Sequence, residues 1–377
     1  MNIQEPIRIL HVLGSTNLGG AQSFVMNLYR KIDKDRIQFD FVIHTEENCH
    51  YDEEIKSYGG KVFSCPPYNF KNHFKYIKWW RNFYKHNYKN YAYIHSHIRS
   101  TALIIILCSK EYNIKTIVHS HSISSGKGIT SVIKNIMQYP VRYISDYQFA
   151  CSKLAGEWLF GKKINEKKSY YIIKNAIDID RFIYNNQIRE KIRKELGINN
   201  HEIVVGHIGR MTIAKNHDRI IRIFNEVVKE DANFRLLLVG DGELRESINE
   251  LIKEFKLEKK VFMSGAKENP EEYLQAMDLF LFPSLWEGLG ISLIEAQANG
   301  LNCFISENIP DEVKLTHLVD TLSLNSSDVE WSNQILKTQF TRTNYNDLNI
   351  KNQISSQGYN INVTTKFMEE FYTKEKN

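Results

Sequence analysis

Short apolar runs alternate with helical stretches along the first half of the chain, and this alternation limits the fold to few architectures. Residues 7–13, 39–43, 61–64, 92–95, 116–119 and 148–151 are the expected strands, and residues 21–32, 101–112 and 131–144 are the clearest helices between them. Strands that alternate with helices in this way form parallel sheets with helices on both faces. The pattern therefore predicts an α/β fold with a doubly wound parallel sheet.

The same alternation starts again after residue 200. Its expected strands are 203–208, 235–239, 261–264, 279–282 and 302–306, and its clearest helices are 218–228 and 243–255. A length of 377 residues suits two domains of similar size. We therefore expect two Rossmann-like domains whose parallel sheets face a central cleft: an N-terminal domain at 1–168, a C-terminal domain at 169–350, and a last helix within 351–377 that crosses back to the N-terminal domain.

Neither a membrane span nor a signal peptide is indicated. The longest uninterrupted apolar stretch, 102–108, is far shorter than the roughly 20 residues that cross a bilayer. The apolar run near the N-terminus is interrupted by Arg8 and His11, and no basic leader precedes it. We interpret that run as a first strand.

Cysteine usage and net charge exclude several classes of protein. The five cysteines are scattered and form no Cys-x-x-Cys pair, which argues against a disulfide framework or a structural zinc site and favours a reducing cytoplasm. The formal charge of +5 is small for this length, and no helix-turn-helix, zinc-finger or RNA-binding aromatic motif is present. We expect no nucleic-acid partner.

Residues 71–93 form the most unusual stretch of the N-terminal half. They contain six Lys or Arg, no Asp or Glu, and many aromatic residues, which is typical of an amphipathic basic helix. One hypothesis is that this helix contacts an anionic membrane surface or a phosphate-bearing acceptor lipid. The other is that it covers the N-terminal sheet and leaves a solvated basic face. The two hypotheses are compatible.

Glu287 and Glu295 bracket the start of a helix that follows a buried strand, and ligands bind at such strand ends. The amides of Leu289, Gly290 and Ile291, together with the helix dipole, would favour an anion. Mostly helical rise would separate the two carboxylates by about 10 Å, too far to share a proton or a metal. They could instead hold two ends of one elongated polyhydroxylated ligand.

Three further segments accompany this one along the chain. They are a glycine loop at 14–22, an Asn-Ala-Ile-Asp segment within 173–182, and a strand that ends in Gly209-Arg210 with Lys215 five residues beyond the arginine. Taken together and in order, the four segments resemble the family-four retaining glycosyltransferases of the GT-B fold. Two departures are small: Ala176 replaces the usual glycine, and 211–214 replaces a loop that usually contains proline and glutamate. Neither removes a charge that the chemistry needs.

The resemblance implies a donor site for a nucleotide diphosphate sugar. Arg210 and Lys215 would stabilise the departing diphosphate, the arginine by gripping two oxygens and the lysine as a point charge. Glu287 would contact the donor sugar, and Glu295 the ribose hydroxyls. Ala266, after the strand 261–264, would meet the base through its main chain.

Two N-terminal features complete the expected site. His119 ends the strand 116–119 and matches the family's catalytic-region histidine, which would donate a hydrogen bond to the sugar and shape the acceptor pocket. His121 is close enough to take that role instead, and a strand-end histidine satisfied by the backbone is the alternative. The amides of Gly19 and Gly20, ahead of a helix, would meet the donor phosphate or the acceptor. Their spacing is not Gly-x-Gly-x-x-Gly, which argues against NAD.

No metal or cofactor is expected. Asp178 and Asp180 superficially match the Asp-x-Asp motif of metal-dependent GT-A transferases, but they lie in the segment between the expected domains, and we interpret the match as coincidence. GT-B enzymes generally use Arg and Lys in place of a divalent metal.

The leading hypothesis is a metal-independent, retaining hexosyltransferase. Its donor would be UDP-linked, and its acceptor a saccharide or a polyprenyl-diphosphate-linked saccharide in bacterial capsule, exopolysaccharide or lipopolysaccharide synthesis. It would act in the cytoplasm, peripherally on the inner face of the membrane. Two alternatives remain: a nucleotide-sugar-binding partner of another transferase that lacks turnover, or a GT-B-fold nucleotide-sugar epimerase with His119 and Glu287 as its only acid and base candidates.

Overall fold

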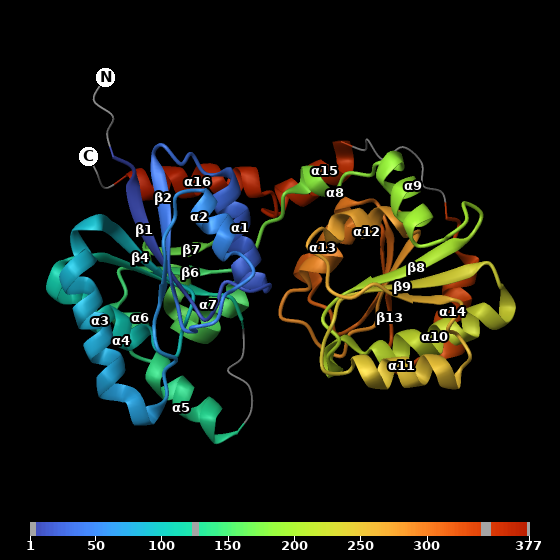
Figure 1. Cartoon of the computed structure of the whole chain (residues 1–377), viewed down its shortest axis with the longest axis horizontal. Helices are drawn as coiled ribbons and strands as arrows, with labels where there is room; N and C mark the ends of the chain where they lie inside the picture. The colour runs from blue at the N-terminus through green and yellow to red at the C-terminus, as the bar shows by residue number, and fades with distance from the viewer. Residues whose placement is uncertain (1–4, 123–127, 341–347, 375–377) are drawn as a thin grey trace. The chain divides into compact units, whose positions relative to one another are not determined.

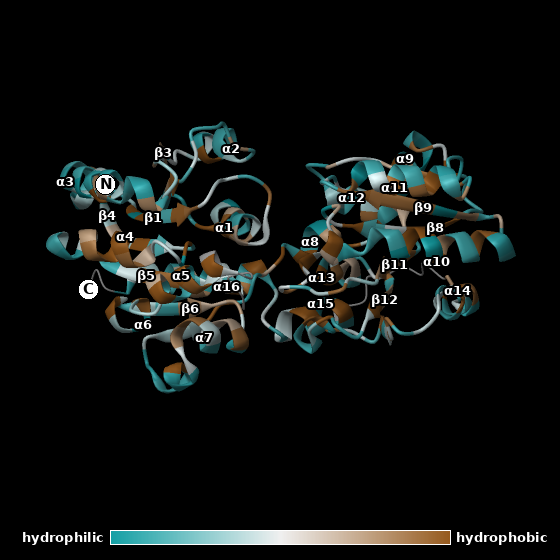
Figure 2. Ribbon diagram, turned by 90° about the horizontal axis from the view of Figure 1, so that it is seen from below, coloured by the Kyte–Doolittle hydropathy of each residue, from teal (hydrophilic) through white to brown (hydrophobic). Residues whose placement is uncertain are grey.

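The computed structural model of the chain describes residues 5–122, 128–340 and 348–374. It divides into two units, each built around its own parallel sheet (Figure 1). The first unit comprises Met1–Ala176 and Gly358–Asn377, and the second comprises Ile177–Gln357. Figure 2 shows hydrophobic residues along the strands and hydrophilic residues on many outer helix faces.

The sheet of the first unit has seven strands in the order β3-β2-β1-β4-β5-β6-β7, and every adjacent pair is parallel. The strands are β1 (Ile7–Leu13), β2 (Ile37–Ile43), β3 (Val62–Ser64), β4 (Tyr91–Ser96), β5 (Lys115–Ser120), β6 (Tyr147–Ala150) and β7 (Tyr170–Ile172). The helices are α1 (Gly20–Lys31), α2 (Asp52–Ser57), α3 (His73–Asn87), α4 (Ala102–Ser109), α5 (Ile129–Gln138), α6 (Val141–Ile144), α7 (Lys153–Phe160) and α16 (Ile361–Thr373).

The two faces of this sheet bury different helices, because successive side chains of a strand point to opposite sides. From β1, Ile9 and Leu13 pack into the core formed with α1 and α16. Leu10 and Val12 pack into the opposite core with α3 and α4. Nearly every β1 residue is buried, as expected for a strand covered on both faces.

The sheet of the second unit has six parallel strands in the order β10-β9-β8-β11-β12-β13. The strands are β8 (Ile203–Ile208), β9 (Phe234–Val239), β10 (Val261–Met263), β11 (Leu279–Phe282), β12 (Asn302–Ser306) and β13 (Val319–Leu322). The helices are α8 (Ile179–Phe182), α9 (Asn186–Glu195), α10 (His217–Glu230), α11 (Arg245–Glu254), α12 (Pro270–Ala276), α13 (Ile291–Ala298), α14 (Asp328–Lys337) and α15 (Leu348–Ser356).

The predicted α/β class with two doubly wound domains is confirmed, and the expected strands 7–13, 203–208, 279–282 and 302–306 match β1, β8, β11 and β12 residue for residue. The edge strands β7 and β13 were not predicted. Edge strands are buried on fewer sides, and these two lack the apolar runs of the central strands.

Two predicted helices are shorter than expected. The helix expected at 131–144 is divided into α5 and α6 at Pro140, because proline lacks the N–H that a continuous helix needs. Of the stretch 71–93, only residues 73–87 form α3, and β4 begins at Tyr91.

The chain passes between the units later than the expected boundary at 168/169. β7 pairs with β6 and therefore belongs to the N-terminal sheet, so the first unit extends to Ala176. Helix α15 lies in the second unit, and α16 packs against α1 in the first. Phe371 and Tyr372 of α16 are buried in the core of the N-terminal sheet. Among the helices in the described part of the chain, none combines the length and apolar character needed to cross a bilayer.

Candidate active site

Most of the predicted donor-site residues of the second unit follow the two strands at which the order of the sheet reverses. Strands β8 and β11 are neighbours in the sheet, although β9 and β10 separate them in the chain. The chain leaves the carboxyl ends of these two strands in opposite directions, toward β9 and toward β12. This is a topological switch point, where open α/β sheets bind ligands. Arg210 follows β8 and Glu287 follows β11, so the sheet brings these two loops to one edge.

Lys215 and Glu287 form an ion pair at this edge. Lys215 Nζ lies 2.7 Å from Glu287 Oε1, and both side chains are largely buried. The lysine also lies over the ring of Phe282, 4.8 Å from its centroid. The backbone joins the same loops, because the N–H of Leu285 donates to the carbonyl of Ala214 at 2.8 Å. Sequence reasoning gave these two charges separate roles and did not anticipate their contact.

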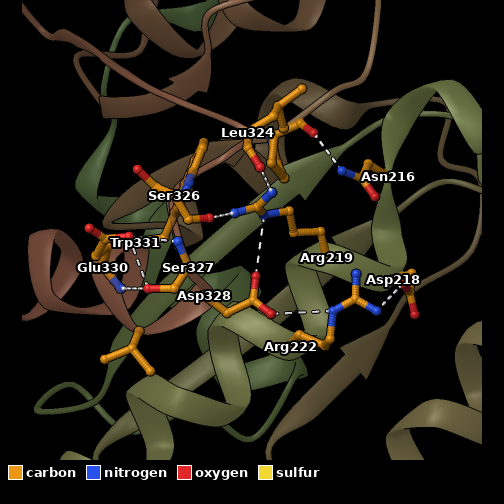
Figure 3. A network of polar contacts seen from close by, with 12 residues as sticks. Asn216, Asp218, Arg219, Arg222, Leu324, Ser326, Ser327, Asp328, Glu330 and Trp331 are labelled. Carbon is orange, nitrogen blue, oxygen red and sulfur yellow. Dashed lines mark hydrogen bonds and ion pairs between the residues drawn. The ribbon is translucent and has the colours of Figure 1, made fainter.

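The loop that carries Lys215 is anchored by the residues after it. Asn216 has a left-handed backbone (φ 57°), and its Nδ2 donates to the carbonyl of Pro283 at 3.0 Å. One turn into α10, Arg219 donates to the carbonyls of Leu324 and Ser326 and pairs with Asp328 at 3.3 Å (Figure 3). These contacts fix the start of α10, and with it the position of the lysine.

Arg210 differs from Lys215 in its exposure to solvent. Its side chain is 76% exposed, and its nearest acidic partner is Glu243, 3.7 Å away and itself exposed. An exposed pair of this kind contributes little to stability, so the guanidinium can exchange this partner for a substrate oxyanion.

The start of α13, where an anion site was predicted, lies beside the ion pair. Gly290 is the N-cap residue with φ 86° and ψ 51°, a conformation that side-chain-bearing residues rarely adopt. Leu289 is buried, and the first amides of a helix have no intrahelical partner. The amides around Gly290 and Ile291, with the positive end of the helix dipole, favour an anion here.

Glu295 lies one turn further into α13 and is an unusual carboxyl group. Burial raises its pKa to about 7, and the nearby Glu271 adds to the rise, while Arg181 and Lys215 oppose it. Arg181 and Glu271 pair with each other. A carboxyl with this pKa is divided between its acid and carboxylate forms near neutrality.

Ala266 is exposed and lies in the loop after β10. The preceding Gly265 has φ 73°, and its carbonyl accepts from the N–H of Gly240 at 2.9 Å. The contact of Ala266 with a nucleotide base stays a prediction.

His207 was missed by sequence reasoning. It is fully buried on β8, and its Nδ1 lies 2.9 Å from the carbonyl of Leu281. Its Nε2 is buried without a hydrogen-bond partner in the described structure, and a Cβ on Gly209 would meet that atom at 2.8 Å. Burial, with His217 and Lys215 nearby, holds the pKa of His207 well below its usual value. The available signal was a histidine within an otherwise apolar strand.

Five histidines gather on the central strands of the first unit and the loops that follow them. His11 Nδ1 lies 3.0 Å from His97 Nε2, and His97 Nδ1 lies 2.8 Å from His121 Nε2. A second chain links His119 through His95 (3.3 Å) to the hydroxyl of Tyr372 on α16 (2.7 Å). Burial lowers the pKa of each of these histidines, so the rings are neutral at pH 7.

The two histidines that sequence reasoning could not separate differ in accessibility. His119 is wholly buried against Phe24 and Phe149. His121 is partly exposed, and its Nδ1 lies 3.0 Å from Asn175 Oδ1. Of the two, His121 is therefore the more accessible residue, and His119 stacks behind it at 4.0 Å.

Subsets of these histidines come close enough to suggest a metal site. Their rings stack, however, with His119 on His121 at 4.0 Å and His95 on His97 at 4.4 Å. Their ring nitrogens also form hydrogen bonds to one another. The expected absence of a metal stays a prediction. Asp180, of the Asp-x-Asp match, pairs with Lys351 at 2.5 Å.

The glycine loop follows β1, next to the switch point of the first sheet between β1 and β4. Gly19 is the N-cap residue of α1, which begins at Gly20. A Cβ at Gly19 would meet Gln22 Oε1 at 2.6 Å, a contact that the flexible glutamine side chain can relieve by moving. A ligand role for the two amides stays a prediction.

The fold is the GT-B architecture of two doubly wound units. The crystal structure of Anabaena HepE in complex with UDP and glucose superposes with a TM-score of 0.76 at 17% identity, covering 98% of this chain and 100% of that one.

The sequence comparisons then identify the family. The family model Glycosyltransferase Family 4 matches residues 18–181, and Glycosyl transferases group 1 matches residues 188–315. A Bacillus subtilis protein named as a glycosyltransferase, EpsF, is 34% identical over 337 residues, covering 88% of this chain and 87% of the relative. The chain therefore belongs to glycosyltransferase family four.

Two other relatives are more distant. The capsular polysaccharide biosynthesis glycosyltransferase CapH of Staphylococcus aureus is 25% identical and covers 97% of this chain and 98% of its own length. The Escherichia coli UDP-Gal:alpha-D-GlcNAc-diphosphoundecaprenol alpha-1,3-galactosyltransferase is 22% identical and covers 75% of this chain and 76% of its own length.

Proposed function

We propose that this glycosyltransferase moves a hexose from a UDP-linked donor to a saccharide carried on a polyprenyl diphosphate, with retention at the anomeric carbon, in the assembly of a bacterial surface polysaccharide. The observation that carries the proposal is the buried Lys215–Glu287 pair beside the N-terminus of α13. The UDP and glucose bound by HepE, and the lipid-linked acceptor in the name of the Escherichia coli relative, support the choice of donor and acceptor.

The residues suit the departure of a nucleoside diphosphate. Breaking the bond between the sugar C1 and the phosphate oxygen adds negative charge to the diphosphate, which Arg210, Lys215 and the amides at Gly290 are arranged to receive. The acceptor oxygen forms the new bond to C1, and its proton passes to the departing diphosphate. Arg210 and Lys215 then take the role that a divalent metal has in other transferases, so we propose that no metal is required.

Glu287 would accept a hydrogen bond from the transferred sugar while it holds Lys215 in place. Glu295 would accept from the ribose hydroxyls in its ionised form. His121, as the more accessible histidine, would contact the sugar substrate by exchanging the hydrogen bond that its Nδ1–H donates to Asn175 Oδ1 for one to a sugar hydroxyl, and His119 would support it from behind.

The test is turnover of a panel of UDP-, GDP- and ADP-linked hexoses in the presence of EDTA. Slow, saturable hydrolysis of one UDP-sugar, and faster transfer when a polyprenyl-diphosphate-linked saccharide is added, is the expected result. Stereochemistry at C1 of the product is then assigned by NMR. Binding without turnover under all conditions would favour the non-catalytic partner, and conversion of the donor to an epimer without acceptor would favour the epimerase.

A further inference from the structure

An exposed apolar stripe runs along α5 and α6 of the first unit. Its five residues are 52–79% exposed: Ile129, Val132, Ile136, Tyr139 and Tyr143. They recur at alternating spacings of three and four, so they share one side of the helical segment. Scattered exposed apolar residues are ordinary, but a row of five on one face is not.

The part of the chain around this stripe is strongly basic. Residues 55–145 contain fourteen Lys or Arg and a single acidic residue, Glu111, whereas the remaining residues contain 35 Lys or Arg and 43 Asp or Glu. Lys134 of α5 is exposed, and so are Lys75, Lys78, Arg81 and Lys85 of α3. The modest net charge of the whole chain therefore conceals a large positive charge on one segment.

The helices that carry these features lie together. α4 packs against α3, α5 and α6, and Figure 1 shows all four on the same side of the N-terminal sheet. α4 adds Leu107, which is 51% exposed, and Phe74 near the start of α3 is 85% exposed. Apolar and basic side chains are thus presented by neighbouring helices.

We propose that α5 and α6, assisted by the basic face of α3, bind the surface of an anionic lipid bilayer. The apolar stripe would enter the boundary between headgroups and acyl chains, where tyrosines such as Tyr139 and Tyr143 are favoured. The lysines and arginines would attract the acidic headgroups.

In the folded structure, α3 differs in its contribution to this surface from α5 and α6, whereas one hypothesis from the sequence gave the whole contact to residues 71–93. Four of the aromatic residues of α3 that made residues 71–93 a membrane candidate, Tyr76, Trp80, Phe83 and Tyr84, are buried under the helix in the core of the unit. They cannot reach a bilayer. α3 therefore supplies charge, and the apolar contact comes from α5 and α6.

A lipid surface fits this face better than a second copy of the chain. Two copies would bring the same basic helices together, and like charges repel. The stripe is also interrupted at Pro140, and α5 has only ten residues, which is short for a helix that pairs as a coiled coil. The inference does not depend on the identity of the donor sugar.

The experiment is co-sedimentation of the full chain with vesicles of phosphatidylcholine alone or mixed in equal parts with phosphatidylglycerol. The triple variant Ile129→Ser, Val132→Ser, Ile136→Ser removes the stripe. The matched control is Val329→Ser with Val363→Ser, two valines on α14 and α16 that are 51% and 58% exposed. Binding of UDP and the melting temperature establish that each variant is folded.

We expect the wild type to bind the phosphatidylglycerol vesicles and to release as salt is raised. The triple variant should lose at least ~10-fold in partitioning, and the control should match the wild type. Replacing Lys75, Lys78 and Lys134 by Gln should lower partitioning by roughly fivefold for each charge, with no effect on phosphatidylcholine alone.

Equal binding by the triple variant and the wild type would overturn the inference, as would the absence of wild-type binding to either vesicle. So would a wild-type dimer that the triple variant converts to a monomer in light scattering. Hydrolysis of a UDP-sugar in free solution is measured in parallel. If hydrolysis persists without vesicle binding, only this inference fails; if vesicle binding persists without any turnover, only the proposed function fails.

Discussion

Lys215 and Glu287 neutralise each other at the place where the donor diphosphate is proposed to bind. Lys215 therefore supplies a positive charge at a fixed position. The Glu287 carboxylate at 2.7 Å and the ring of Phe282 hold its Nζ near the end of β11. The exposed Arg210 complements it with a charge that is free to move. One fixed cation and one mobile cation can together follow a leaving group as its charge grows.

Glu287→Gln keeps the shape of this side chain but removes its charge. We expect kcat/KM for the donor to fall by about 10²–10³, since Lys215 loses its orientation and the sugar loses a charged acceptor. Steady-state kinetics are the measurement. Glu226→Gln is the matched control, because Glu226 pairs with Lys229 at 2.6 Å on an exposed part of α10. Equal rates in the two variants would contradict the assigned role.

Glu295 should make stability depend on pH. Its pKa is about 7 in the folded chain against 4.5 in an unfolded one, so the folded chain keeps a proton that the unfolded chain has lost. The free energy of unfolding therefore decreases as pH rises from 4.5 to 7, by up to about 3 kcal/mol in total. Above pH 7 Glu295 causes no further decrease. Glu295→Gln should remove this dependence.

The measurement for Glu295 is the free energy of unfolding of wild type and variant in urea at several pH values. The difference, variant minus wild type, should be larger at pH 8 than at pH 5. Parallel curves would show that the burial of Glu295 does not control its ionisation.

Replacement of His119 should mainly affect stability, and replacement of His121 should mainly affect activity. His121→Ala should lower kcat by about 10²-fold or more and should lower the melting temperature less than His119→Ala does, because His121 is the less buried of the two and is proposed to contact the substrate. His119→Ala should lower the free energy of unfolding by about 2–4 kcal/mol, because it leaves a cavity between Phe24 and Phe149. Kinetics and thermal denaturation of both variants distinguish the two; the reverse pattern would make His119 the substrate contact.

Among the elements, α10 has the clearest link to the site. Lys215 and Asn216 precede it, and Arg219 in its first turns ties it to the backbone that leads into α14 (Figure 3). Asp328 forms ion pairs with both Arg219 and Arg222, each at 3.3 Å. The lysine is thus positioned by contacts that reach a distant part of the sequence.

Arg219→Met should lower the free energy of unfolding by about 2–4 kcal/mol, because it leaves two carbonyls and a carboxylate without their buried partner. It should also raise the KM for the donor, since the start of α10 loses its anchor. Arg222→Met is the control: its side chain is 43% exposed, and we expect a loss below about 1 kcal/mol. Urea denaturation and donor titration test both, and equal losses would argue against a buried network.

At the scale of the whole molecule, the two units differ in how the chain builds them. The second unit is one continuous segment, Ile177–Gln357, with its own hydrophobic core. The first unit needs two segments, because α16 returns from the C-terminus and buries Ile361, Met368, Phe371 and Tyr372 in the core of the N-terminal sheet.

The fragment Ile177–Gln357 should therefore fold alone and bind UDP with an affinity close to that of the full chain. Truncation of the full chain after Gln357 should unfold the first unit, because the loss of four buried side chains, at about 2–5 kcal/mol each, is as large as the typical stability of a domain, about 5–15 kcal/mol. Calorimetry should then show one thermal transition for the truncated chain and two for the full chain. A truncated chain with both transitions would mean that α16 is dispensable.

Much of this molecule follows from local information in the chain. Short apolar runs, helical apolar patterns and the glycines at the ends of strands are set by residues close in sequence, which is why β1, β8, β11 and β12 were placed correctly. The same patterns put Arg210, Lys215, Glu287 and Glu295 at strand ends or helix starts. The family motifs added their expected roles.

Contacts between distant residues could not be derived in this way. The Lys215–Glu287 pair joins loops 72 positions apart, His119 is covered while His121 is not, and the aromatic residues of α3 turn inward while α5 exposes its apolar side. Each outcome depends on which side chains the folded sheet brings into reach and which it removes from water. A linear pattern contains the chemistry of these groups, but their accessibility and their partners arise only when the chain is packed.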